Sequence, residues 1–169
     1  MHYSTRLSLP VPAHRAWSLL ADVHNWPSWT PTVESVSGNP VSGNPVSGNP
    51  VSGNPVSGNS VGSSALEVGA VVHIKQPGRR IASYTVDLVE PGQRFRWGSD
   101  RLGVRQSADH VVTATGGSTC TVELSFTMEG PLGGPVGRLG ASRIRSMVDT
   151  EAASLRTALT SETAQGGAA

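Results

Sequence analysis

Residues 119–129 alternate strictly between apolar and polar side chains, and no other segment constrains the fold as strongly. The apolar positions are Cys120, Val122, Leu124, Phe126 and Met128. A period of two predicts a β-strand that buries one face and exposes the other, which is typical of antiparallel sheets. Such a strand is stable only where other elements cover its apolar face.

Similar alternation predicts further strands, at residues 3–9, 70–76, 82–89, 93–98 and 108–113. Their phases place a common set of side chains on the apolar face: Ile74, Tyr84, Val86, Leu88, Phe95, Trp97, Ala108, His110 and Val112. Asp87 and Glu123 fall on the opposite, polar face. The glycine-containing residues 116–118 suit a turn before the last strand, so antiparallel pairing is expected.

Helical patterns precede and follow these strands. Residues 13–22 repeat apolar side chains at helical spacing behind Pro12, and residues 24–31 suit a second short helix. A long amphipathic helix is expected from Pro135, with an apolar stripe formed by Val136, Leu139, Ile144, Met147, Val148, Leu155 and Leu159. Its charged side chains are expected largely off this stripe, at Arg138, Arg145, Asp149, Glu151 and Arg156.

A five-residue repeat interrupts this pattern. The unit VSGNP recurs without change and then ends as VSGNS, at residues 36–40, 41–45, 46–50, 51–55 and 56–60. Each unit supplies one apolar side chain, which buries too little surface to offset the entropy of ordering the unit. The Asn-Pro bonds stop any helix. An exposed loop is therefore expected, either a flexible insertion without a function or a lid or partner-binding segment.

Without the repeat, both flanks fit one α+β domain. We expect a single domain over residues 1–163, interrupted by the repeat loop at 36–60 and followed by a flexible tail at 164–169. One curved sheet that packs against the final helix would bury both apolar faces at once.

Composition and motifs exclude several function classes. The formal net charge is only +1, without the basic stripe of a nucleic-acid-binding protein. No apolar run is long enough to cross a bilayer, and the first residues lack the order of a signal peptide, so a cytoplasmic protein is expected. The single cysteine, the scattered histidines and the absence of phosphate-loop or dinucleotide motifs predict no metal and no cofactor.

The order of several short motifs resembles a known superfamily. The matching segments are residues 11–17 (VPAHRAW), 22–29 (DVHNWPSW), 67–70 (EVGA), 89–95 (VEPGQRF), 108–110 (ADH) and 126–132 (FTMEGPL). In this order they resemble the SRPBCC superfamily of START-like proteins, and most closely its bacterial polyketide cyclase/dehydrase and lipid transport family. The repeat departs from the family, which has a short connection between its second and third strands.

The resemblance implies a helix-grip fold. This is a curved seven-stranded antiparallel sheet wrapped around a long C-terminal helix, with two short helices after the first strand and a ligand cavity between sheet and helix. It does not imply one activity, because some relatives cyclise or dehydrate polyketides and others carry lipids or hormones.

His110 is the candidate general acid or base, because its strand phase places it among apolar side chains. The alternative is a core histidine satisfied by one hydrogen bond. Tyr84 is a candidate to orient a ligand carbonyl, or an ordinary amphipathic wall residue. The side chains expected to line the cavity are Trp29, Ile74, Tyr84, Val86, Phe95, Trp97, His110, Leu124, Phe126, Ile144 and Met147.

Two functions fit these residues. The first is a non-catalytic binder or carrier of a hydrophobic small molecule, lipid-like or polyketide-like. The second is a polyketide cyclase or dehydratase that uses His110 with help from Tyr84. A lack of paired titratable residues on the expected inner faces favours the binder. A third reading, a protein-interaction module acting through the repeat, has less support, and the oligomeric state is left open.

Overall fold

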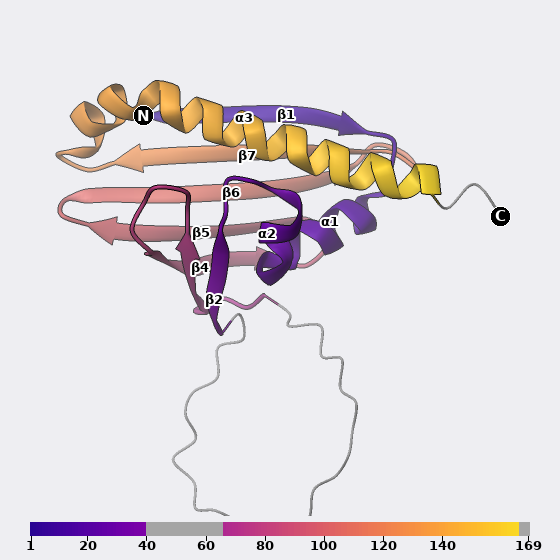
Figure 1. Cartoon of the computed structure of the whole chain (residues 1–169), viewed down its shortest axis with the longest axis horizontal. Coiled ribbons are helices and arrows are strands. Elements are labelled where there is room, and N and C mark those ends of the chain that lie inside the picture. The colour runs from indigo at the N-terminus through magenta and orange to yellow at the C-terminus, as the bar shows by residue number, and fades with distance from the viewer. Residues whose placement is uncertain (40–65, 166–169) are drawn as a thin grey trace, which may run out of the picture.

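A computed structural model describes residues 1–39 and 66–165 of the chain (Figure 1). Its strands form one seven-stranded antiparallel sheet in the order β1-β7-β6-β5-β4-β3-β2. Their bounds are β1 His2–Leu9, β2 Ser35–Asn39, β3 Val71–Lys75, β4 Ala82–Glu90, β5 Arg94–Arg101, β6 Val104–Ala114 and β7 Cys120–Glu129. The predicted antiparallel sheet is confirmed.

Helices cover one face of this sheet. They are α1 Ala13–Ala21, the 3-10 helix η1 Val23–Asn25, α2 Trp26–Trp29 and the long α3 Gly133–Gln165. Figure 1 shows α3 crossing the sheet, where it packs on β1 and β7, while α1 and α2 lie toward the other edge. The buried apolar side chains form one core between these helices and the sheet. The predicted helix-grip arrangement is therefore confirmed.

A register shift changes the inward face of β4. Pairing between β4 and β5 slips between Val86 and Leu88, so the side-chain alternation changes phase there. Val86 is fully buried and Val89 packs against the core, whereas Leu88 does not belong to it. The expectation that Leu88 shares a face with Tyr84 and Val86 is wrong for this reason.

The predicted apolar stripe of α3 is correct only in part. Ile144, Val148, Leu155 and Leu159 are buried, but Leu139 is 92% exposed. Leu139 precedes Val148 by nine positions, which is two and a half helical turns, and therefore lies on the opposite face. Met147 is half-buried against the core, and the side chain of Val136 lies outside the described residues.

The first repeat unit is not a loop. Strand β2, Ser35–Asn39, pairs with β3, and Gly38 lies opposite Val72 in this pairing. Gly38 has a φ of 105°, and a Cβ there would lie 2.4 Å from the carbonyl oxygen of Val71, so only glycine fits. The expected loop therefore begins later than residue 36, and its remaining units fall outside the described residues. At the other end, α3 continues to Gln165, beyond the predicted domain limit at 163.

Packing of α3 on the sheet predicts a clear contrast between two leucines of the same helix. Leu155 is fully buried, so Leu155→Ala should lower the free energy of unfolding by about 3 kcal/mol, the usual cost of emptying a core leucine site. Leu139→Ala is the matched control and should change it by less than about 0.5 kcal/mol. Urea unfolding measures both variants, and equal losses would contradict the packing described for α3.

Candidate functional site

A small cavity lies between the sheet and α3. Its volume is about 40 Å³, and it is lined by Trp26, Val33, Ile74, Gln76, Tyr84, Trp97, Ala108, His110, Phe126, Met147 and Glu151. The lining comes from β3, β4, β5, β6 and β7 below, and from α2 and α3 above. We call this space the inner cavity. It has room for water-sized molecules and is far below the ~300–1,000 Å³ of typical ligand sites.

Aromatic rings enclose His110. Its imidazole stacks on Phe95, with ring centroids 4.3 Å apart and planes 11° apart. Trp26 and Trp97 meet the same ring edge-on, at 5.4 and 5.5 Å. Strand phase explains the arrangement, because Phe95 and Trp97 alternate inward on β5 and Phe95 lies directly opposite His110 on β6.

A carboxylate faces the same histidine. The Nε2 atom of His110 lies 3.4 Å from Oε1 of Glu151 on α3, and their side chains are only 4% and 12% exposed. The other ring nitrogen, Nδ1, is buried without a hydrogen-bond partner in the described part of the chain. One ring nitrogen of His110 thus has a polar neighbour and the other has none, and the choice between a catalytic and a structural histidine stays a prediction. The sequence indicated few titratable pairs on the inner faces and did not predict this one.

Tyr84 supplies a neutral hydroxyl to the same space. Burial raises the pKa of Tyr84 above its usual value of 10.0, and the positive charge of Arg79 partly opposes this shift. The phenol therefore stays protonated near neutral pH and can donate a hydrogen bond to a carbonyl. Its ring also packs at 5.9 Å from that of Trp97.

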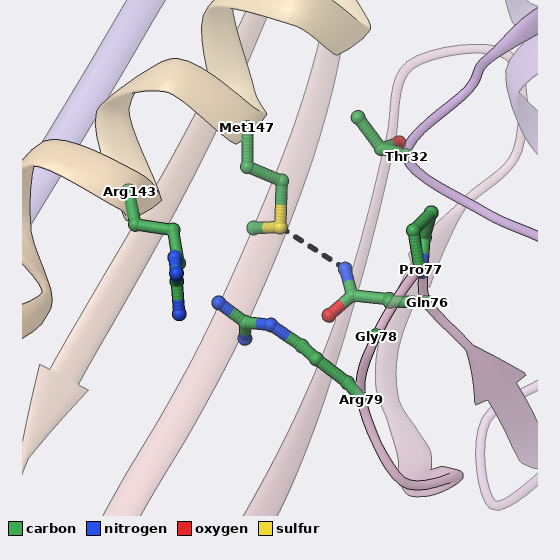
Figure 2. Close-up of a pocket in the computed structure, with 7 residues that line it drawn as sticks. All are labelled: Thr32, Gln76, Pro77, Gly78, Arg79, Arg143 and Met147. Carbon is green, nitrogen blue, oxygen red and sulfur yellow. Dashed lines mark hydrogen bonds between the residues drawn. The ribbon is translucent and has the colours of Figure 1, made fainter.

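A larger pocket adjoins the inner cavity on its outer side. Its volume is about 310 Å³, and Figure 2 shows its lining residues: Thr32, Gln76, Pro77, Gly78, Arg79, Arg143 and Met147. We call it the outer pocket. Gln76 and Met147 line both spaces, and the amide Nε2 of Gln76 donates to Sδ of Met147 over 3.0 Å. We call this contact, made by the two residues that line both spaces, the partition.

Other carboxylates of the sheet are engaged in ion pairs away from this site. Asp87 pairs with Arg96, Asp109 with Arg94 and Glu123 with Arg6. The hydrogen bond between Arg94 and Asp109 raises the pKa of Arg94 above its usual value. Within residues 1–39 and 66–165, no three histidine, cysteine or acidic side chains gather as a metal site would. Over the same residues, no helix is long and apolar enough to span a membrane.

Comparison with known proteins identifies the family. The model of the family described as polyketide cyclase / dehydrase and lipid transport matches residues 2–160. The chain belongs to this family. No curated protein matches the sequence.

Solved structures share the fold at low sequence identity. Norcoclaurine synthase from Thalictrum flavum, solved with dopamine and hydroxybenzaldehyde, is 14% identical with a TM-score of 0.63, covering 96% of this chain and 87% of that one. A START superfamily protein from Mycobacterium smegmatis is 10% identical with a TM-score of 0.62, covering 95% and 97%. The di-domain ARO/CYC protein BexL is 17% identical with a TM-score of 0.60. This match covers 92% of the present chain but only 45% of BexL. These matches show the helix-grip, START-like fold.

The structure gathers part of the predicted site. The predicted residues that line the inner cavity are Ile74, Tyr84, Trp97, His110, Phe126 and Met147. The others do not line either space: Trp29, Val86, Phe95, Leu124 and Ile144. Phe95 instead stacks on the ring of His110. Val86, Leu124 and Ile144 are core residues. The ligand-binding role of the whole set stays a prediction.

Glu151 is the functional candidate that the sequence pattern missed. It was expected off the apolar stripe because it is charged. Yet it follows Met147 by four positions and precedes Leu155 by four, and this spacing places all three on one face of α3. Glu151 could have been identified as a candidate from its position on the helix, if its charge had not been considered first.

The unpartnered imidazole atom of His110 predicts an unusual response to mutation. A buried donor or acceptor without a partner costs about 1–3 kcal/mol, and His110→Phe removes this cost, but it also leaves the buried carboxylate of Glu151 without its imidazole neighbour. His110→Phe should therefore lower the free energy of unfolding by less than His110→Ala does. The phenyl ring retains the stacking on Phe95. His110→Ala removes the ring and should lower stability by about 3 kcal/mol. Thermal and urea unfolding compare the variants, and equal losses in both would show that the imidazole nitrogens are satisfied in the folded protein.

Proposed function

We propose that this domain binds an apolar, ring-containing small molecule in the space formed by the outer pocket and the inner cavity. The observation that carries the proposal is that the two spaces share Gln76 and Met147, whose side chains contact each other. The outer pocket alone is at the lower end of the size range of small-molecule sites. Together the two spaces offer apolar walls with a few polar groups, which is typical of such sites.

Met147 is suited to act as the movable part of this site. Its thioether side chain is flexible, and it is half-buried between the two spaces. Rotation of the side chain would enlarge the inner cavity without moving the backbone of α3. The aromatic rings of Trp97 and Phe126 would then be exposed to the bound molecule as stacking and edge contacts.

A second candidate function is that of a cyclase or dehydratase. His110 and Glu151 form a buried pair in which one group can hold a proton while the other accepts one. Tyr84, protonated near neutral pH, is available in the same cavity to donate a hydrogen bond to a carbonyl oxygen. Proton removal next to that carbonyl is a step that cyclisation and dehydration share. This pair is the observation that favours an enzyme over a simple carrier.

A small molecule is a better proposed partner than a nucleic acid. The chain has 13 basic and 12 acidic residues, a balance that gives little attraction for phosphate backbones. The cytoplasmic location expected from the sequence stays a prediction.

The binding proposal predicts uptake of an uncharged fluorescent probe, N-phenylnaphthylamine. Its emission should rise on binding, and Met147→Trp should weaken binding about tenfold or more, since a bulkier side chain fills the space between the two pockets. Leu139→Trp, on the exposed face of α3, is the control and should leave the affinity unchanged. Absence of binding to the unaltered protein would refute the proposal.

The enzymatic alternative predicts proton exchange on a simple ketone. In heavy water, 2-tetralone should lose hydrogen next to its carbonyl and take up deuterium faster with the protein than without it. NMR follows the exchange. His110→Phe and Glu151→Gln should return the rate to that of buffer while leaving binding of the ketone intact. Exchange at the buffer rate with the unaltered protein would leave the carrier function as the better account.

A further inference from the structure

Two arginines converge on the outer pocket. Arg79 extends from the turn between β3 and β4, and Arg143 descends from α3. Figure 2 shows the Arg79 side chain extending toward the guanidinium group of Arg143. No acidic residue belongs to the pocket lining, so its charge is positive.

Neither arginine has an ionic partner in the described part of the chain. Other basic side chains lie within 4.0 Å of a carboxylate, among them Arg6, Lys75, Arg94, Arg96 and Arg105. No such contact exists for Arg79 or Arg143 among residues 1–39 and 66–165. Two facing positive charges repel each other, and an anion between them would remove that repulsion.

Gln76 adds a hydrogen-bond donor to the same pocket. Its amide currently donates to the sulfur of Met147, which is a weak acceptor. An oxygen anion is a far stronger acceptor and would draw the amide away from the sulfur. Because this contact is the partition described above, the same exchange would free Met147 to rotate.

The inner end of the site differs in character from the outer end. The arginines line only the outer pocket, whereas the inner cavity is lined mainly by apolar and aromatic side chains, with Glu151 and His110 among them. An anionic group is therefore attracted to the outer end, and an apolar group fits the inner one.

We propose that the ligand is an amphipathic anion, whose carboxylate or phosphate group binds Arg79, Arg143 and Gln76 while its apolar part passes Met147 into the inner cavity. This inference rests on the proposed binding function and adds the chemical class of the ligand. It also assigns a role to Gln76 as the residue that couples anion binding to opening of the partition.

Two probes with the same aromatic body test this. Anilinonaphthalene sulfonate carries an anionic group, and N-phenylnaphthylamine lacks it. The anionic probe should bind the unaltered protein about tenfold or more tightly than the neutral one, the ratio that one charge-assisted hydrogen bond gives. Arg79→Gln and Arg143→Gln should remove this preference, so that the two probes bind with about equal affinity. The neighbouring changes Arg80→Gln and Arg145→Gln, outside the pocket lining, are the controls and should keep the preference.

Competition separates the possible anions. Naphthoate and naphthyl phosphate should each displace the anionic probe, and whichever is more effective identifies the group. Inorganic phosphate alone should not displace it at equal concentration, because it lacks the apolar part. If the neutral probe binds but the anionic probe shows no preference, or if the control arginines matter equally, the inference is wrong while the binding function stands. If neither probe binds, the binding function itself is wrong.

Discussion

The rest of the structure depends on the packing of α3 against the apolar face of the sheet. Alternation in β5, β6 and β7 places a continuous apolar surface on one side, and Ile144, Val148 and Leu155 of α3 cover part of it. The register of the sheet must agree with the phase of the helix, because a shift of one residue in any strand would expose its buried side chains. The same packing creates the space in which His110, Glu151 and Met147 meet.

Within that space, volume and charge set what can bind. The rings around His110 fill most of the interior, so the inner cavity is small. The arginines give the outer pocket a positive charge, whereas apolar and aromatic side chains line most of the inner cavity. A small apolar space next to a positively charged pocket favours, in our proposal, a molecule with an apolar and an anionic end.

The sequence predicted those features that depend on local periodicity. Alternation placed Trp97, His110 and Phe126 on one face, and the resemblance to a family supplied the helix-grip arrangement that brings them under α3. Prediction from the sequence failed for features that depend on contacts between distant segments. The register shift after Val86 cannot be read from the residue pattern, and neither can the exact approach of Glu151 to His110. Arg79 and Arg143 line one pocket although they belong to a turn and a helix far apart in the chain, which periodicity does not address.

Met147 offers the most direct test of the central claim, that a ligand binds between the sheet and α3. The chain has three methionines, and carbon-13 labelling of their methyl groups gives three separate NMR signals. On addition of anilinonaphthalene sulfonate, the signal of the Met147 methyl should shift and show nuclear Overhauser contacts with the naphthalene ring. Met1 and Met128, which line neither space, should show no such contacts. Contacts to either of them instead, with Met147 unaffected, would contradict the account.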